Sequence, residues 1–136
     1  MARRTQWIPH FSTGNSTLDE QHQSLLAQCN ALADCLGASG QGSGNSCPGI
    51  LEKLMASVRE HFATEQKLLA RHGYPMLDEH EHECEEFEFL ASEILSTENF
   101  DMDELQTFLA LWCTGHIAGT SLRQRPYLER QSESAT

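Results

Sequence analysis

Four histidines and one glutamate occur at intervals that fit the inward faces of helices. They are His22, His61, Glu65, His80 and His116. His61 and Glu65 are four residues apart, so on a helix both side chains point to one face. Imidazole nitrogen and carboxylate oxygen are ligands that suit iron, manganese and zinc. Because helical bundles build metal sites from side chains on facing helices, this spacing predicts a metal site inside a bundle.

Four segments with helical periodicity could position these side chains. Their apolar stripes predict helices over about 18–36, 48–72, 76–95 and 101–126. Pro75 breaks the chain after the second segment, and Pro126 is expected to end the fourth. Asp101 with Glu104 three residues later resembles a capping box, which starts a helix. Strand patterns are missing, so we predict an all-α fold: an up-down-up-down four-helix bundle with an extended N-terminal arm.

The 136 residues are expected to form one domain, with the arm at about 1–17 and the bundle at about 18–128. Trp7 and Phe11 are apolar residues of the arm, and we expect them to pack against the bundle. Gly14 and Asn15 mark a turn before the first helix. The segment 37–49 is rich in glycine and serine, and we expect a flexible connection without chemical importance.

The charge and hydropathy of the chain exclude several partners. Nine Lys and Arg against twenty Asp and Glu give a formal charge of −11, which argues against nucleic acid and anionic membranes. No apolar run approaches the roughly 18–20 residues needed to span a membrane. The N-terminal residues lack the apolar stretch of a signal peptide, so the cytoplasm is the expected location.

The five cysteines do not suggest a disulfide framework. They are Cys29, Cys35, Cys47, Cys84 and Cys113. The odd count and the missing CxxC pair favour reduced thiols, most of them acting as small core hydrophobes.

Three motifs follow one another in an order typical of one family. WIPHFSTGNSTLDEQH is an aromatic arm followed by a Leu-Asp-x-Gln-His helix start, HFATEQKLLARHGYP is an HxxxE segment with a trailing Gly-Tyr-Pro, and LWCTGHIAG contains W-x-x-x-H-I. By these motifs, from Trp7 to about Leu128, the chain resembles the hemerythrin family, specifically its bacterial single-domain members. Several motifs in order are specific, whereas one HxxxE would be weak.

The resemblance implies a site of two irons, held by five histidines and two bridging carboxylates, that binds dioxygen at one iron. Carried over to this sequence, His22 and His61 would bind the iron with the open position. Glu65 would bridge the metals, and His80 and His116 would bind the second iron.

Two positions depart from the family's pattern. Residue 84, four after His80, is Cys where the family has His, and residue 121, five after His116, is Ser where it has Asp. A Cys84 thiolate would favour zinc or make an iron site redox-labile. A weakened di-iron site, a mononuclear site of iron or zinc, and a mixed site with one tight and one loose metal all stay open. For a single metal, His22, His61 and Glu65 form a set of two histidines and one carboxylate that suits non-haem iron.

Neighbouring residues offer little repair of these two positions. His82 lies about 200° around the helix from His80 and should face elsewhere. Glu83 is nearer the right face but would need adjustment to reach the site. We therefore expect the second metal to be bound more weakly and the site to oxidise faster than in family members with the full ligand set.

The leading hypothesis is a hemerythrin-like non-haem iron protein, not an enzyme, that binds dioxygen or a related diatomic for storage, delivery or sensing. Trp112, one turn before His116, would line its oxygen pocket. The alternatives are a mononuclear-metal or Cys84-linked redox or nitric oxide sensor, an enzyme that activates peroxide or oxygen, and a bundle without metal. Five surviving ligands argue against the last, since burying unpaired polar groups is costly. The oligomeric state stays open.

Overall fold

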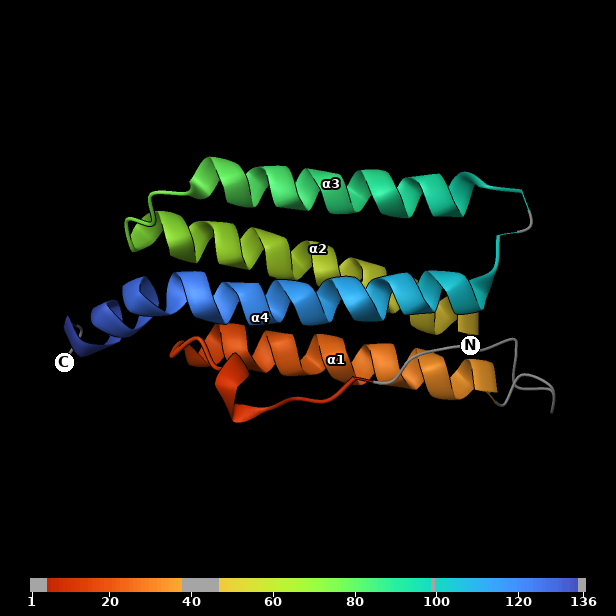
Figure 1. The fold of residues 1–136 in the computed structure, drawn as a ribbon, viewed down its shortest axis with the longest axis horizontal. Coiled ribbons are helices and arrows are strands. Elements are labelled where there is room, and N and C mark those ends of the chain that lie inside the picture. The colour runs from red at the N-terminus through yellow and green to blue at the C-terminus, as the bar shows by residue number, and fades with distance from the viewer. Residues whose placement is uncertain (1–4, 38–46, 99, 135–136) are drawn as a thin grey trace.

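The protein folds as four long α-helices that run side by side and alternate in direction (Figure 1). The structure, a computed structural model, describes residues 5–37, 47–98 and 100–134. The elements are the 3-10 turn η1 (Pro9–Phe11) and the helices α1 (Ser16–Gly37), α2 (Cys47–Arg71), α3 (Leu77–Ser96) and α4 (Met102–Ser134). The predicted all-α, up-down-up-down bundle is confirmed.

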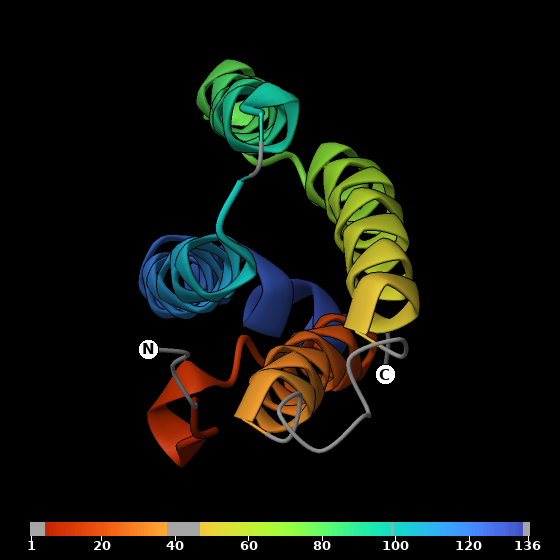
Figure 2. The same cartoon turned by 90° about the vertical axis from the view of Figure 1, so that its right-hand side faces the viewer.

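The helices form the four corners of the bundle (Figure 2). α1 and α3 occupy opposite corners, because each of them packs against both α2 and α4. Most residues of the apolar stripes line the core between the helices, whereas Leu95 near the end of α3 is 37% exposed. α3 buries only His80, Phe87 and Ala91, so a periodic position near its end can remain at the surface. Among the described residues, no helix is both long and apolar enough to cross a lipid bilayer.

The helix ends follow the local residues that the sequence singled out. Asn15 Oδ1 accepts a hydrogen bond of 3.1 Å from the backbone N–H of Leu18, which caps α1. Asp101 Oδ1 accepts one of 2.9 Å from Asp103 N–H and starts α4 in the same way. Gly73 adopts a left-handed φ of 71°, which ends the helical path of α2.

Apolar packing and hydrogen bonds hold the N-terminal arm against the bundle. Phe11 lies in the hydrophobic core and Trp7 packs against that core, with ring centroids 5.7 Å apart. The guanidinium of Arg125 on α4 donates to the carbonyl oxygens of Ser12 at 2.9 Å and His10 at 2.7 Å. The expected packing of the arm's aromatic residues is therefore confirmed.

α4 does not end at Pro126 as predicted, because this proline lies inside the helix. Proline removes the N–H that would bond the carbonyl of Leu122. Leu122 is 75% exposed, so it lies on the side of the helix where water can replace this bond. Leu128 beyond the proline is fully buried, and its burial stabilises the continued helix. The C-terminal end of α4 bends away from the rest of the helix (Figure 1).

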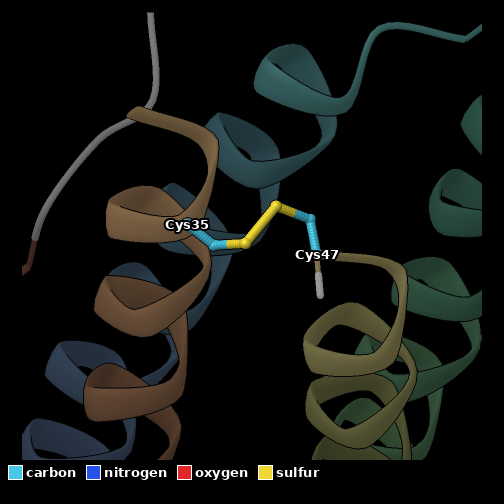
Figure 3. Close-up of a disulfide and its surroundings, with 2 residues drawn as sticks. All are labelled: Cys35 and Cys47. Atoms are coloured by element: carbon cyan, nitrogen blue, oxygen red, sulfur yellow. A yellow bond between two sulfur atoms is a disulfide. The ribbon is translucent and has the colours of Figure 1, made fainter. Parts of the chain in front are cut away.

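A disulfide joins Cys35 in the last turn of α1 to Cys47 at the start of α2 (Figure 3). Their Cα atoms are 5.8 Å apart. This corrects the expectation drawn from the cysteine count, because the antiparallel α1 and α2 bring their connected ends together and a count cannot show that. Cys29, Cys84 and Cys113 are free thiols, as expected for most of the cysteines. The predicted flexible connection lies mostly in 38–46, outside the described residues.

Candidate metal centre

Three helices bring four buried ligand groups to one point in the core. His22 of α1, His61 and Glu65 of α2, and His116 of α4 each offer one ligand atom, and these atoms all lie within 4.8 Å of one another. Each side chain is at most 3% exposed. The spacing of four between His61 and Glu65 puts both on the inner face of α2, as the sequence predicted.

Glu65 is the central residue of this cluster. Its Oε2 lies 2.7 Å from His61 Nε2, 3.2 Å from His116 Nε2 and 3.5 Å from His22 Nε2. Its Oε1 lies 2.6 Å from His80 Nε2, on α3. The structure therefore gathers the four selected histidines around the carboxylate of the fifth selected residue, Glu65. It groups His116 with His22 and His61, so the assignment of ligands to individual metals stays a prediction.

Glutamine side chains fix the orientation of two of the imidazoles. His61 Nδ1 donates to Gln21 Oε1 at 2.8 Å, and His80 Nδ1 donates to Gln66 Oε1 at 2.6 Å. Since an amide oxygen only accepts, each of these histidines carries its proton on Nδ1 when neutral. The lone pair of each Nε2 then faces Glu65, which is the form that binds a metal.

A carboxylate has the same role for the third imidazole. His116 Nδ1 lies 3.2 Å from Glu83 Oε1, and Glu83 Oε2 accepts a 3.4 Å hydrogen bond from Arg123. Glu83 thus contacts the imidazole of His116 rather than the centre itself. Within the described ranges, His22 Nδ1 is buried without a hydrogen-bond partner.

The burial and charge of the cluster show which groups carry protons in the metal-free protein. Burial opposes ionisation of Glu65, but the charge of His116 and its hydrogen bond to the carboxylate hold the pKa of Glu65 well below the usual value. Burial also opposes the charge on His116, but Glu65 outweighs it and raises the pKa to about 9. For His61 burial dominates and lowers the pKa to about 4. One imidazolium therefore balances the Glu65 carboxylate.

These donors fit a metal cation. The imidazoles of His61, His80 and His116 direct their Nδ1–H groups outward and their Nε2 atoms inward, where these meet the two oxygens of Glu65. The centre therefore holds more hydrogen-bond acceptors than donors. A metal cation would compensate these excess acceptors in the way that a proton does. His22 Nε2 and His61 Nε2 are 3.0 Å apart, which matches two nitrogens each about 2.1 Å from one metal and at a right angle.

Aromatic rings cover one side of the centre. Trp112 stacks on His116, with centroids 4.8 Å apart and an interplanar angle of 10°. It also contacts Phe62 at 5.3 Å and Phe87 at 4.6 Å. Trp112 therefore lies beside the imidazole where the sequence placed it, and its role in lining a pocket for oxygen stays a prediction.

The two altered positions differ in how near they come to the centre. Cys84 is half-buried, and its Sγ lies 4.0 Å from both ring nitrogens of His80. Burial, with the nearby charge of Glu65, raises the pKa of its thiol to about 12, so it is a thiol in the metal-free protein. Ser121 is buried, but its hydroxyl donates to the carbonyl of Ala118 at 2.9 Å on its own helix. Nothing at residue 121 replaces a bridging carboxylate.

Sequence reasoning missed the glutamines around the centre. Gln21 and Gln66 directly neighbour predicted ligands in the sequence, but each one bonds a histidine on the adjacent helix, which a linear pattern does not reveal. Gln124 of α4 is also buried, and its amide nitrogen donates to Glu65 Oε1 at 3.4 Å. His82 faces solvent, as its angular position predicted.

This chain belongs to the hemerythrin family, since residues 13–121 match the family's Hemerythrin HHE cation binding domain. A hemerythrin-like protein of Naegleria gruberi is 27% identical over 122 residues, which are 90% of this chain and 92% of that protein. A myohemerythrin of Theromyzon tessulatum is 26% identical over 123 residues, 88% of this chain and 90% of the relative. A bacteriohemerythrin of Stenotrophomonas maltophilia (strain R551-3) is 25% identical over 122 residues, 83% of this chain and 74% of the relative. No solved structure gives a significant match.

Membership of this family supports a non-haem metal site and a protein of the oxygen-binding type. The site geometry agrees with a metal-binding role, because the buried imidazoles and carboxylate form a donor set for a cation.

Proposed function

We propose that this protein binds non-haem iron at an atypical hemerythrin centre and uses it to bind dioxygen or a related diatomic, for storage, delivery or sensing. The observation that carries the proposal is the convergence of His22, His61 and His116 on Glu65, all buried and within 4.8 Å. Membership of the hemerythrin family supports the choice of iron.

The proposed ligands are His22, His61, Glu65, His80 and His116. Ferrous iron would supply the electrons and the free coordination position that a diatomic ligand needs. The protein's own contribution is to hold the Nε2 lone pairs inward through Gln21, Gln66 and Glu83. Such outer partners orient metal-binding imidazoles and strengthen their hold on the metal.

We propose ligand binding rather than catalysis, because aromatic rings are packed directly against the imidazoles. Trp112 stacks on His116, and Phe62 lies with its ring centroid 5.9 Å from the same imidazole. Rings packed this closely keep water away from that face of His116 and would crowd out an organic substrate there.

A mononuclear or cysteine-linked sensor is the second candidate, and two observations favour it. Three histidines gather at one oxygen of Glu65, whereas one histidine, His80, approaches the other. Cys84 also lines a surface cavity of about 270 Å³ with Phe62 and Gln66, through which an oxidant can reach the thiol. Peroxide or nitric oxide would then modify Cys84 or release metal, and an unchanged response of the Cys84→Ser variant would exclude this candidate.

The oxygen-binding proposal is tested by loading the protein with ferrous iron under argon and then cycling it between argon and air. We expect a charge-transfer absorption band that appears in air and disappears under argon over repeated cycles. A band that never forms, or one that forms once and does not reverse, would rule out reversible dioxygen binding.

A further inference from the structure

Gln124 reaches the centre from α4, the helix on which the expected bridging carboxylate is missing. It is three residues beyond Ser121, which places both on one side of the helix. Gln124 is 2% exposed, and its Nε2 donates to Glu65 Oε1 at 3.4 Å. Its own Oε1 is buried and has no hydrogen-bond partner in the part of the chain that the structure describes.

The surroundings of this amide suit a cation. Gln124 and His80 together line a cavity of about 360 Å³, so there is space beside the amide. Three glutamates, Glu79, Glu83 and Glu86, contribute to its walls together with Arg123. A cavity with an excess of negative charge attracts and concentrates cations.

We propose that Gln124 is a further ligand of the metal centre, whose amide oxygen takes the place of the carboxylate absent at residue 121. This inference rests on the proposed function, since it requires a metal beside Glu65. An amide oxygen is a hard, neutral donor of the kind that binds divalent cations in proteins. A half-turn of the amide exchanges its nitrogen and oxygen, which brings the oxygen to the position that now faces Glu65 Oε1.

The proposal differs from a purely positioning role, in which Gln124 acts only by donating its N–H to Glu65. The Gln124→Leu variant removes both the amide oxygen and the N–H group, so both roles predict weaker metal binding. The Gln124→Glu variant removes the N–H but supplies a charged oxygen. A ligand role predicts tighter metal binding for this variant, and a positioning role predicts weaker binding.

Gln106 provides a matched control on the same helix. It is fully buried, and its Nε2 donates to the carbonyl of Cys29 at 3.0 Å. Its distance from Gln124 along α4 is about 27 Å at the rise of an α-helix. The Gln106→Leu variant therefore removes a buried amide from α4 without removing a group that contacts Glu65.

The experiment measures the number of ferrous ions bound per chain and their Kd under argon, by competition with a coloured chelator. We expect Gln124→Leu to weaken binding about tenfold, Gln124→Glu to tighten it, and Gln106→Leu to match the unaltered protein. Circular dichroism of the metal-free variants reports their folding. If Gln124→Leu does not fold, the change in the Kd of Gln124→Glu distinguishes a ligand role from a positioning role.

Two results would overturn the assignment of Gln124 while leaving the proposed function intact. In one, the unaltered protein binds iron and Gln124→Leu binds it as tightly as Gln106→Leu does. In the other, Gln124→Glu weakens binding. If the unaltered protein binds no ferrous iron, the proposed function fails and the inference fails with it.

Discussion

The amide oxygen of Gln21 lies 2.8 Å from Nδ1 of His61, across the interface between α1 and α2. The amide nitrogen of Gln21 donates to Thr64 at 3.3 Å, which holds the amide in this orientation. His61 must therefore carry a proton on Nδ1 and present Nε2 to Glu65. A residue of one helix thus orients a proposed metal ligand of the next.

Replacing Gln21 by leucine should weaken metal binding by about tenfold to a hundredfold, the range typical of partners behind a metal-binding histidine. The loss arises because His61 is then free to place its proton on Nε2. Competition with a chelator measures the change. Gln28, also half-buried on α1, bonds Ser24 and Ser57 instead of a histidine, so Gln28→Leu should bind metal normally. Equal affinities in both variants would contradict the role given to Gln21.

The metal-free protein should be most stable near pH 6.5. The pKa of His116 is raised to about 9, so its stabilising effect is complete below pH 6.5 and is lost as the pH rises through 9. The pKa of His61 is lowered to about 4, so its effect is present above pH 6.5 and is lost as the pH falls towards 4. Urea unfolding between pH 4 and pH 9 measures the loss of stability on both sides of this maximum.

The His116→Gln variant is the control for the loss of stability at alkaline pH, because it lacks the imidazole whose proton is lost there. Its unfolding free energy should change less between pH 6.5 and 9 than that of the unaltered protein. An unaltered protein whose stability rises over this interval would contradict the charge pairing of His116 with Glu65.

The helices and the five proposed ligands follow from the sequence because both depend on residues close together in the chain. His61 and Glu65 share a helix face at a spacing that can be read directly. Pro126 shows the limit of such local rules, since the burial of Leu128 beyond it outweighs the helix-breaking tendency of proline. The disulfide of Cys35 and Cys47 likewise depends on how two helices pack.

The groups behind the ligands could not be predicted from the sequence because each contact crosses between helices. Gln66 on α2 bonds His80 on α3, and Glu83 on α3 bonds His116 on α4. Helical periodicity shows which face a residue occupies but not which partner stands opposite it. The position of Glu83 behind a ligand, instead of inside the centre, depends on this packing.

Restoring the family's residues at both altered positions should strengthen the second metal site. The double variant Cys84→His with Ser121→Asp adds an imidazole and a carboxylate, whose charge offsets a second cation. We expect the number of tightly bound irons per chain to rise and oxidation in air to slow. Metal analysis and the decay of the ferrous form measure these effects.

The comparison variant is Cys84→Ser with Ser121→Asn, which changes the same two positions without adding an imidazole or a charge. It should not gain iron. If the double variant with His and Asp also gains none and oxidises at the original rate, the two substitutions do not explain the atypical centre.

Reducing the disulfide between Cys35 and Cys47 should lower the unfolding free energy of the metal-free protein by about 2–3 kcal/mol, because the bond closes a short loop in the unfolded chain. The cysteines are 12 residues apart in sequence. Urea unfolding with and without a reductant measures the difference. The unfolding free energy of the Cys35→Ser variant should respond to reductant much less. An effect of equal size in that variant would show that the loss of stability does not come from this disulfide.

An iron site formed by the buried histidines and Glu65 is tested most directly by the iron content per chain after loading under argon and removal of loosely bound metal. We predict at least about one iron in the unaltered protein, the minimum for one occupied centre, and a large loss in the Glu65→Ala variant. No retained iron in the unaltered protein, or the same content in the variant, would rule out an iron site at Glu65.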